Sequence, residues 1–205
     1  MSERKLTKAE ARRKQAFEEL KLQMLEAGYQ TKELKLGVVQ ANIWAIVASA
    51  PFCILVLVVY GMLHGNPLLE DYSRWLLMAA IIIGIVVHEL LHGLTWALFA
   101  KNGWKSIEFG VIWQYATPYC TCSEPMKKGP MILAAIMPTI ILGFLPAVLG
   151  ILLGKGFLIA FSLILIIGGG GDMLIILNIL KYRSKTKEKL YLDHPYEVGT
   201  FVFEK

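Results

Sequence analysis

Charged side chains are scarce in this chain and are unevenly spread. Asp, Glu, Lys and Arg make up 18% of the 205 residues, whereas 56% of the residues are hydrophobic. A soluble globular domain carries about 25% charged residues. An ordinary soluble domain is therefore excluded, because buried helices of a soluble bundle would still present polar faces to water, and the long apolar stretches of this chain lack such faces.

The apolar residues are concentrated in four blocks, each long enough to cross a membrane. A helical span of the hydrocarbon core takes about 20 residues. The expected spans are residues 38–63, 75–100, 131–153 and 157–180. The sequence therefore predicts an all-α polytopic membrane protein with four transmembrane helices.

Basic residues outside the spans alternate between two sides of the expected membrane. Residues 1–35 contain nine Lys and Arg, residues 101–129 contain four, and residues 181–205 contain six. The other two connections, residues 64–74 and 154–156, contain one each. Because cytoplasmic loops carry the excess of Lys and Arg, both termini are expected in the cytoplasm. The formal net charge of +5 then reflects this topology and contact with anionic lipid heads, and no nucleic-acid partner is expected.

These spans divide the chain into three regions. A cytoplasmic amphipathic segment over residues 1–35 precedes the membrane domain over residues 36–180, and a cytoplasmic tail over residues 181–205 follows it. An apolar stripe in the first region predicts a helix over residues 7–27, packed on its own cytosolic face or resting on the membrane surface. The stripe consists of Phe17, Leu20, Met24 and Leu25.

A short β-hairpin is predicted within residues 103–125, between the second and third spans. Residues 105–115 alternate in part and are rich in β-branched and aromatic side chains. Thr117 and Pro118 interrupt the run, and residues 119–122 form the expected second strand. Because an isolated hairpin is marginal in water, this one is expected to lean on the membrane-embedded bundle.

Cysteine is rare, with three residues in the chain. Cys53 lies in an expected span, while Cys120 and Cys122 fall on the expected cytoplasmic side, where thiols stay reduced. A disulfide-stabilised fold is therefore not expected. Cys120 and Cys122 qualify as metal ligands only if the hairpin reaches into the membrane.

Residues 88–92 read His-Glu-Leu-Leu-His and hold the only ionisable side chains between Trp75 and Ala100. On a helix His92 is turned by about 40° from His88, so the two imidazoles lie on one face, one turn apart. Two imidazoles at this spacing with an adjacent carboxylate are typical of a catalytic zinc site. A charged group at membrane depth costs about 3 kcal/mol, and a bound metal would offset that cost.

Asp172 is the candidate third ligand, and it follows four glycines, residues 168–171. These glycines indicate either close helix packing or local unwinding beside a polar cavity. Asp172 lies nine residues before Lys181, and His92 lies nine residues before Lys101. With a rise of 1.5 Å per residue, the three candidate ligands lie within about 6 Å of one another along the membrane normal. Two His and one Asp would form an open zinc site; the alternative for Asp172 is a hydrogen bond between helices.

Glu89 is the candidate general base. It is turned by about 100° from His88, so it lies beside a metal held by the histidines without ligating it. A carboxylate in this position takes a proton from a metal-activated water and passes it to the leaving amine.

The order of these features resembles the three-span core of site-2-type intramembrane zinc metalloproteases. The chain more closely resembles the small bacterial membrane proteins called putative zincin peptidases, over about residues 75–200. The motifs that carry this resemblance are His88-Glu89-Leu90-Leu91-His92-Gly93, the loop around Thr117-Pro118, Gly170-Gly171-Asp172 and Asp193-His194-Pro195. The resemblance implies a peptidase of the bacterial cytoplasmic membrane. Site-2-type proteases usually hold the last acid in an Asn-Pro-Asp-Gly or Leu-Asp-Gly context, whereas this chain has Gly-Asp-Met.

The leading interpretation is an intramembrane zinc metalloprotease that hydrolyses peptide bonds of membrane-embedded or membrane-adjacent substrates with a metal-activated water. An edge strand of the hairpin would hold the substrate extended by β-augmentation. The expected substrate-binding residues are Ile107, Phe109, Val111, Thr117 and Pro118. Two other interpretations stay open: a membrane protein that carries or senses metal, with Glu89 as a proton relay, and an inactive scaffold that retains the HExxH motif.

Overall fold

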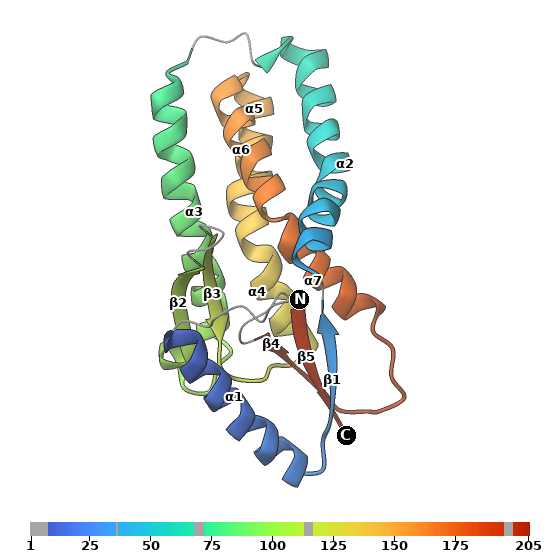
Figure 1. Ribbon diagram of the computed structural model, residues 1–205. Coiled ribbons are helices and arrows are strands. Elements are labelled where there is room, and N and C mark those ends of the chain that lie inside the picture. Colours follow the sequence, from blue (N-terminus) through green and yellow to red (C-terminus); the bar gives the residue numbers. More distant parts are fainter. Residues whose placement is uncertain (1–7, 36, 68–71, 113–116, 195–198) are drawn as a thin grey trace.

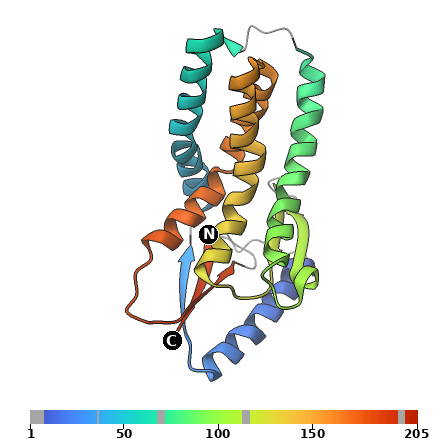
Figure 2. The same ribbon diagram turned by 180° about the vertical axis from the view of Figure 1, so that it is seen from behind.

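Long apolar helices stand side by side in this chain, and the shorter elements gather at one end of them (Figures 1 and 2). The computed structural model describes residues 8–35, 37–67, 72–112, 117–194 and 199–205. Helix α1 (Lys8–Glu26) and two small β-sheets lie at the end where the shorter elements gather. The long helices therefore form the frame, and the strands cover one end of it.

Within the part of the chain that the structure describes, three helices are long and apolar enough to cross a membrane. Helices α2 (Val38–His64) and α3 (Arg74–Ala97) are continuous. The third consists of α4 (Lys128–Pro138), a π-helical segment (Thr139–Phe144) and α5 (Leu145–Leu153). Proline at the end of α4 agrees with the local change of helix type, because proline cannot donate the helical hydrogen bond at its own position.

The fourth apolar block is broken. Helices α6 (Gly156–Gly168) and α7 (Gly170–Lys181) meet at an angle of 45°, and they make a fourth span only if the bent pair counts as one. The expected four spans thus correspond to three long helices and one bent pair. This set of apolar helices fits a membrane protein.

The burial pattern of α3 reverses that of a soluble amphipathic helix. Its buried face carries mainly small and polar residues: Gly84, His88, His92, Gly93, Thr95 and Trp96. Its outer face is apolar, and Ile82 and Ile83 are 62% and 63% exposed. A face of this kind is unfavourable in water and suits lipid tails, so the polar residues of α3 are directed into the protein.

A hairpin connects α3 to α4. Strand β2 (Ile107–Ile112) pairs antiparallel with β3 (Thr117–Cys122), and Phe109 lies opposite Cys120. The base of the hairpin is held by Glu124, whose carboxylate accepts hydrogen bonds from the backbone N–H groups of Lys101 and Asn102 and from the Ser106 hydroxyl. The strands lie against the end of α3, as an isolated hairpin requires for stability.

A second sheet corrects the all-α prediction and the description of residues 181–205 as a tail. Strands β1 (Gln30–Lys35) and β4 (Lys189–Asp193) flank the central strand β5 (Gly199–Glu204), and all pairs are antiparallel. Every described residue of β5 is buried. The sequence did not reveal this sheet because β1 has a single apolar residue, Leu34, and its partner lies about 170 residues away along the chain.

Helix α1 packs on this sheet through its apolar stripe. Phe17 is 4% exposed, and its ring centroid lies 4.4 Å from that of Phe201 in β5. Leu20 and Met24 join the same cluster, whereas Leu25 is 44% exposed. Of the two expected placements of this helix, packing against the protein is the one observed.

Candidate metal centre

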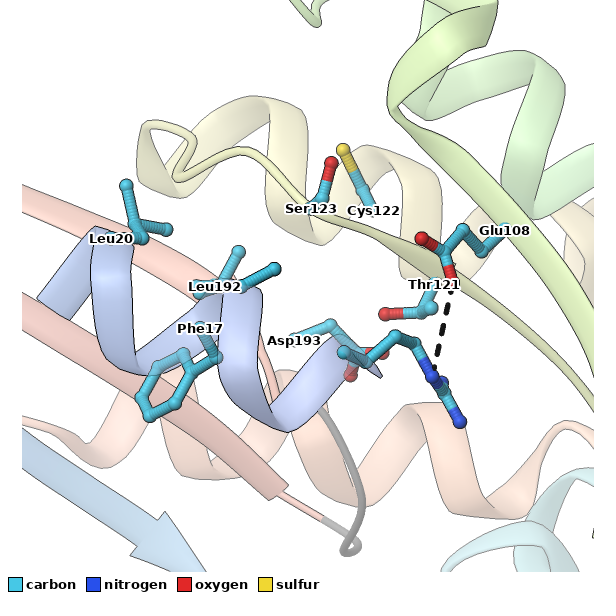
Figure 3. A pocket seen from close by; sticks show the side chains of 10 residues that line it. Phe17, Leu20, Glu108, Thr121, Cys122, Ser123, Leu192 and Asp193 are labelled. Carbon is cyan, nitrogen blue, oxygen red and sulfur yellow. Dashed lines mark ion pairs between the residues drawn. The ribbon is translucent and has the colours of Figure 1, made fainter. Parts of the chain in front are cut away.

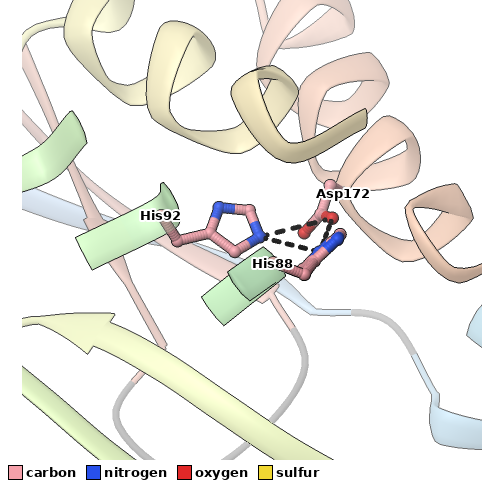
Figure 4. Close-up of side chains that lie close together, drawn as sticks. All are labelled: His88, His92 and Asp172. Carbon is pink, nitrogen blue, oxygen red and sulfur yellow. Dashed lines mark hydrogen bonds and ion pairs between the residues drawn. The ribbon is translucent and has the colours of Figure 1, made fainter. Parts of the chain in front are cut away.

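The three predicted ligands converge from two helices. His88 and His92 lie one turn apart on the buried face of α3 and are 8% and 5% exposed. Asp172 lies in the first turn of α7, and its side chain is 20% exposed. Figure 4 shows the two imidazoles and the carboxylate directed at one another. Among the described residues, these three form the group that could hold a metal ion.

The distances between the donor atoms fit a tetrahedral zinc ion. The Oδ2 atom of Asp172 lies 3.2 Å from Nε2 of His88 and 3.4 Å from Nε2 of His92. The two Nε2 atoms are 3.2 Å apart. Ligand atoms at about 2.0–2.1 Å from a tetrahedral zinc lie roughly 3.4 Å from one another. The three side chains would hold three positions around such an ion and leave one position for water or substrate.

The protonation of His92 also favours a cation at this position. Its Nδ1 atom lies 2.8 Å from the carbonyl oxygen of Ala134 in α4. A carbonyl only accepts hydrogen bonds, so Nδ1 carries the proton, and Nε2 of the neutral ring is an acceptor. This nitrogen faces the carboxylate of Asp172, which is also an acceptor. A metal ion or a proton on Nε2 satisfies both. A backbone carbonyl behind a histidine ligand is a usual arrangement at metal sites.

The glycines before Asp172 allow α7 to start beside α3. A Cβ atom on Gly169 would collide with Thr139 of the π-helical segment, and one on Gly170 would collide with the backbone of Ala45 in α2. Gly168 and Gly171 have open space where a Cβ atom would lie. The two alternatives for these glycines are therefore both realised: the helix breaks here, and two of the glycines permit close packing.

Glu89 lies beside the three ligands and is directed elsewhere. It is half-buried, and its carboxylate lies near the backbone N–H of Cys120 in β3. The hairpin therefore orients the carboxylate on the face of α3 next to the histidines. This placement agrees with a group that moves protons near the metal without binding it.

Gly93 allows this close contact between helix and hairpin. A Cβ atom at Gly93 would lie 2.6 Å from Cζ of Phe109, 3.0 Å from Cγ2 of Ile107 and 3.1 Å from Sγ of Cys120. Any other residue would push the hairpin away from α3. The residue that follows the second histidine is thus a determinant of where β3 lies relative to Glu89.

The two hairpin cysteines are placed as packing residues. Cys120 and Cys122 are buried free thiols and lie outside the group of metal-ligand candidates. Burial raises the pKa of the Cys122 thiol to about 11, and burial together with the nearby Glu89 raises that of Cys120. Their Sγ atoms pack in the core with Trp96 and Met131, apart from the ligand atoms of His88, His92 and Asp172.

The predicted substrate-binding residues occupy different environments. Ile107 is 9% exposed and packs against α3, and Pro118 is half-buried. Phe109 and Val111 are 42% and 37% exposed, and Thr117 is exposed. The exposed apolar part of the hairpin is therefore centred on Phe109 and Val111.

The hairpin makes a polar contact on the face turned away from α3, and the sequence did not predict it. Figure 3 shows a small pocket between α1, β3 and β4. Asp193 lines it and accepts a hydrogen bond from the Thr121 hydroxyl, and burial raises the pKa of Asp193 to about 6. The second sheet is thereby attached to the strand that orients Glu89. No local sequence signal indicates this contact, because its partners are 72 residues apart.

Comparison with known proteins adds one finding. A family model described as "Putative zincin peptidase" matches residues 81–187, which include His88, Glu89, His92 and Asp172. No curated protein and no solved structure matches the chain.

Proposed function

Since the chain belongs to the family described as putative zincin peptidases, we propose that it is a zinc metallopeptidase that cleaves membrane-embedded or membrane-adjacent peptides. The observation that carries this proposal is the convergence of two histidines and an aspartate beside Glu89, on the inner face of a helix long enough to span a membrane. The relationship to site-2-type proteases is part of the proposal.

The residues of this chain divide the work of hydrolysis. His88, His92 and Asp172 hold the metal. Bound zinc supplies a Lewis acid that polarises the substrate carbonyl and makes water acidic enough to lose a proton near neutral pH. Glu89 takes that proton and delivers it to the amine nitrogen as the peptide bond breaks. The backbone N–H of Cys120 holds the carboxylate in place for both transfers.

The substrate has to be extended at this site, because a helical peptide buries its amide groups. We propose that it lies along the exposed apolar part of the hairpin, where Phe109 and Val111 offer contacts and strand pairing would keep the chain extended. Thr117 and Pro118 of β3 complete the proposed surface, whereas Ile107 is buried against α3 and supports the strand from below.

We expect Gly93→Ala to lower peptide cleavage by about ten- to hundredfold while zinc stays bound. The added methyl group moves the hairpin from α3, and displacements of about 1 Å near a reacting centre have effects of this size. Cleavage rate and zinc content of the purified protein measure the two effects. Gly61→Ala in α2, where a Cβ atom meets nothing within 4 Å, is the matched control. Equal activity of the two variants would contradict the proposed role of the hairpin.

The proposed orientation places both termini in the cytoplasm of a bacterial cell, with the site reached from the cytoplasmic side. Reporter fusions at residues 66–72 should be active on the outer face, and fusions after Lys205 on the inner face, because basic residues are retained inside. The reverse pattern would rule out this orientation.

Metal analysis and a comparison of membrane peptides test the proposal as a whole. Purified protein should contain one zinc, and membranes from cells with the natural chain should contain peptide fragments that are missing when Glu89→Gln replaces it. If the protein carries metal, cells with the natural chain and cells with Glu89→Gln should show the same peptide fragments but differ in metal content. A scaffold would keep its cellular effect with Glu89→Gln.

A further inference from the structure

Pro138 lies one helical turn after Ala134 in α4 and is fully buried. In a regular α-helix the carbonyl of Ala134 would accept a hydrogen bond from the N–H of residue 138. Proline has no N–H, and its ring pushes the carbonyl four residues earlier away from the helix axis. The next N–H, that of Thr139, bonds to the carbonyl of Ile136. The Ala134 carbonyl is therefore left without its helical donor.

His92 supplies the missing donor. Its Nδ1 atom, 42 residues earlier in the chain, lies 2.8 Å from the Ala134 oxygen. The ring of His92 also stacks on Trp96, with the centroids 5.5 Å apart and the planes at 25°. The hydrogen bond sets which nitrogen carries the proton, and the stacking sets the plane of the ring. Together they aim Nε2 at Asp172.

We infer that Pro138 is a positioning residue of the metal centre: by removing one backbone N–H, it frees the Ala134 carbonyl that fixes the tautomer and direction of His92. This inference rests on the proposed metal site. This role is separate from bending the helix. A proline at another position would also bend the span, but only a proline at position 138 removes the N–H that would bond to the Ala134 carbonyl.

The same span offers a matched control in Pro146. This proline lies in the first turn of α5, directly after the π-helical segment, and it also removes one backbone N–H from the span. The described hydrogen bonds from histidines to helix carbonyls end at Ile151 and Ala134. Replacing either proline restores one N–H to the helix, but only the replacement of Pro138 gives the Ala134 carbonyl a competing donor.

Zinc affinity of the purified full-length protein, measured in detergent by competition with a chromophoric chelator, is the first test. We expect Pro138→Ala to weaken zinc binding by about ten- to hundredfold, the usual effect of losing a hydrogen bond behind a histidine ligand. Pro146→Ala should bind zinc as the natural chain does. Should Pro138→Ala fail to fold, Pro138→Val restores the same N–H with a side chain that fills more of the space.

Nitrogen NMR of the histidine-labelled, metal-free protein is the second test, and it does not depend on zinc. The resonances that are present in the spectrum of the natural chain and missing from that of His92→Gln belong to His92. We expect Nδ1 of His92 to be protonated in the natural chain and in Pro146→Ala, and the proton to move in part to Nε2 in Pro138→Ala.

The two measurements separate this inference from the proposed function. Unchanged zinc affinity and an unchanged His92 tautomer in Pro138→Ala would overturn the inference. Equal losses of zinc affinity in Pro138→Ala and Pro146→Ala would also overturn it, because they would indicate a general effect of straightening the span. A natural chain that binds no zinc, but whose His92 tautomer responds to Pro138→Ala alone, would sink the proposed function and leave Pro138 as the residue that positions His92.

Discussion

Replacing Glu89 by glutamine is expected to leave zinc bound and to reduce peptide cleavage at least about a hundredfold, the usual contribution of a positioned general base. Glutamine keeps the shape of the side chain and an oxygen that can accept the N–H of Cys120. It loses the basic oxygen that takes up the proton. Because Glu89 points at β3 and not at the three ligands, the metal site should remain intact.

Zinc content and single-turnover cleavage of the same preparation measure the two effects separately. Glu108→Gln is the matched control: it removes a carboxylate from the adjacent strand β2, where Glu108 is 53% exposed and lies 3.9 Å from Arg13. This variant should cleave as the natural chain does, since exposed ion pairs of this length contribute little. A Glu89→Gln variant that cleaves at the natural rate, or one that loses zinc, would contradict the role assigned to Glu89.

Loss of any one ligand is expected to abolish tight zinc binding. His88→Ala, His92→Ala and Asp172→Ala each leave two protein donors, and an open site with three protein ligands has none to spare. Cleavage should be lost with the metal, and a chelator should have the same effect on the natural chain until zinc is added back.

Metal content after dialysis, compared with that of His64→Ala, checks this expectation. His64 lies at the opposite end of α2 and bonds to the carbonyl of Ile151, so its loss should leave zinc in place. If Asp172→Ala kept full occupancy while Cys120→Ser or Cys122→Ser lost it, the third ligand would have been assigned to the wrong side chain.

Local sequence pattern was sufficient for the apolar frame and for the choice of ligands. Hydropathy located the blocks that became α2, α3, the third helix and the bent pair. Helical spacing put His88 and His92 on one face, and counting residues from Lys101 and Lys181 put Asp172 at their depth. These properties depend on the repeat of a single helix or on its length, and both can be counted along the chain.

The orientation of the functional groups was decided by contacts between elements. The acceptor behind His92 is the carbonyl of Ala134, and the backbone group beside Glu89 is the N–H of Cys120. Every residue has a carbonyl and all but proline have an N–H. Pro138 marks the Ala134 carbonyl as lacking its helical donor, but no sequence pattern shows which side chain that carbonyl meets. Only the packing of α4 and β3 against α3 selects these partners.

The same distinction separates the helices from the second sheet. Residues 181–205 read as a tail, because β4 and β5 are short and β1 has no apolar alternation. Their stability comes from pairing Gln30–Lys35 with Gly199–Glu204, at opposite ends of the chain, and from burial of β5 beneath Phe17. The sequence by itself determined which segments are apolar and which residues are candidate metal ligands, since those depend on local composition and spacing. Tertiary structure alone decided how the backbone orients those residues and how the two ends of the chain join, because such contacts bring together groups that no local period relates.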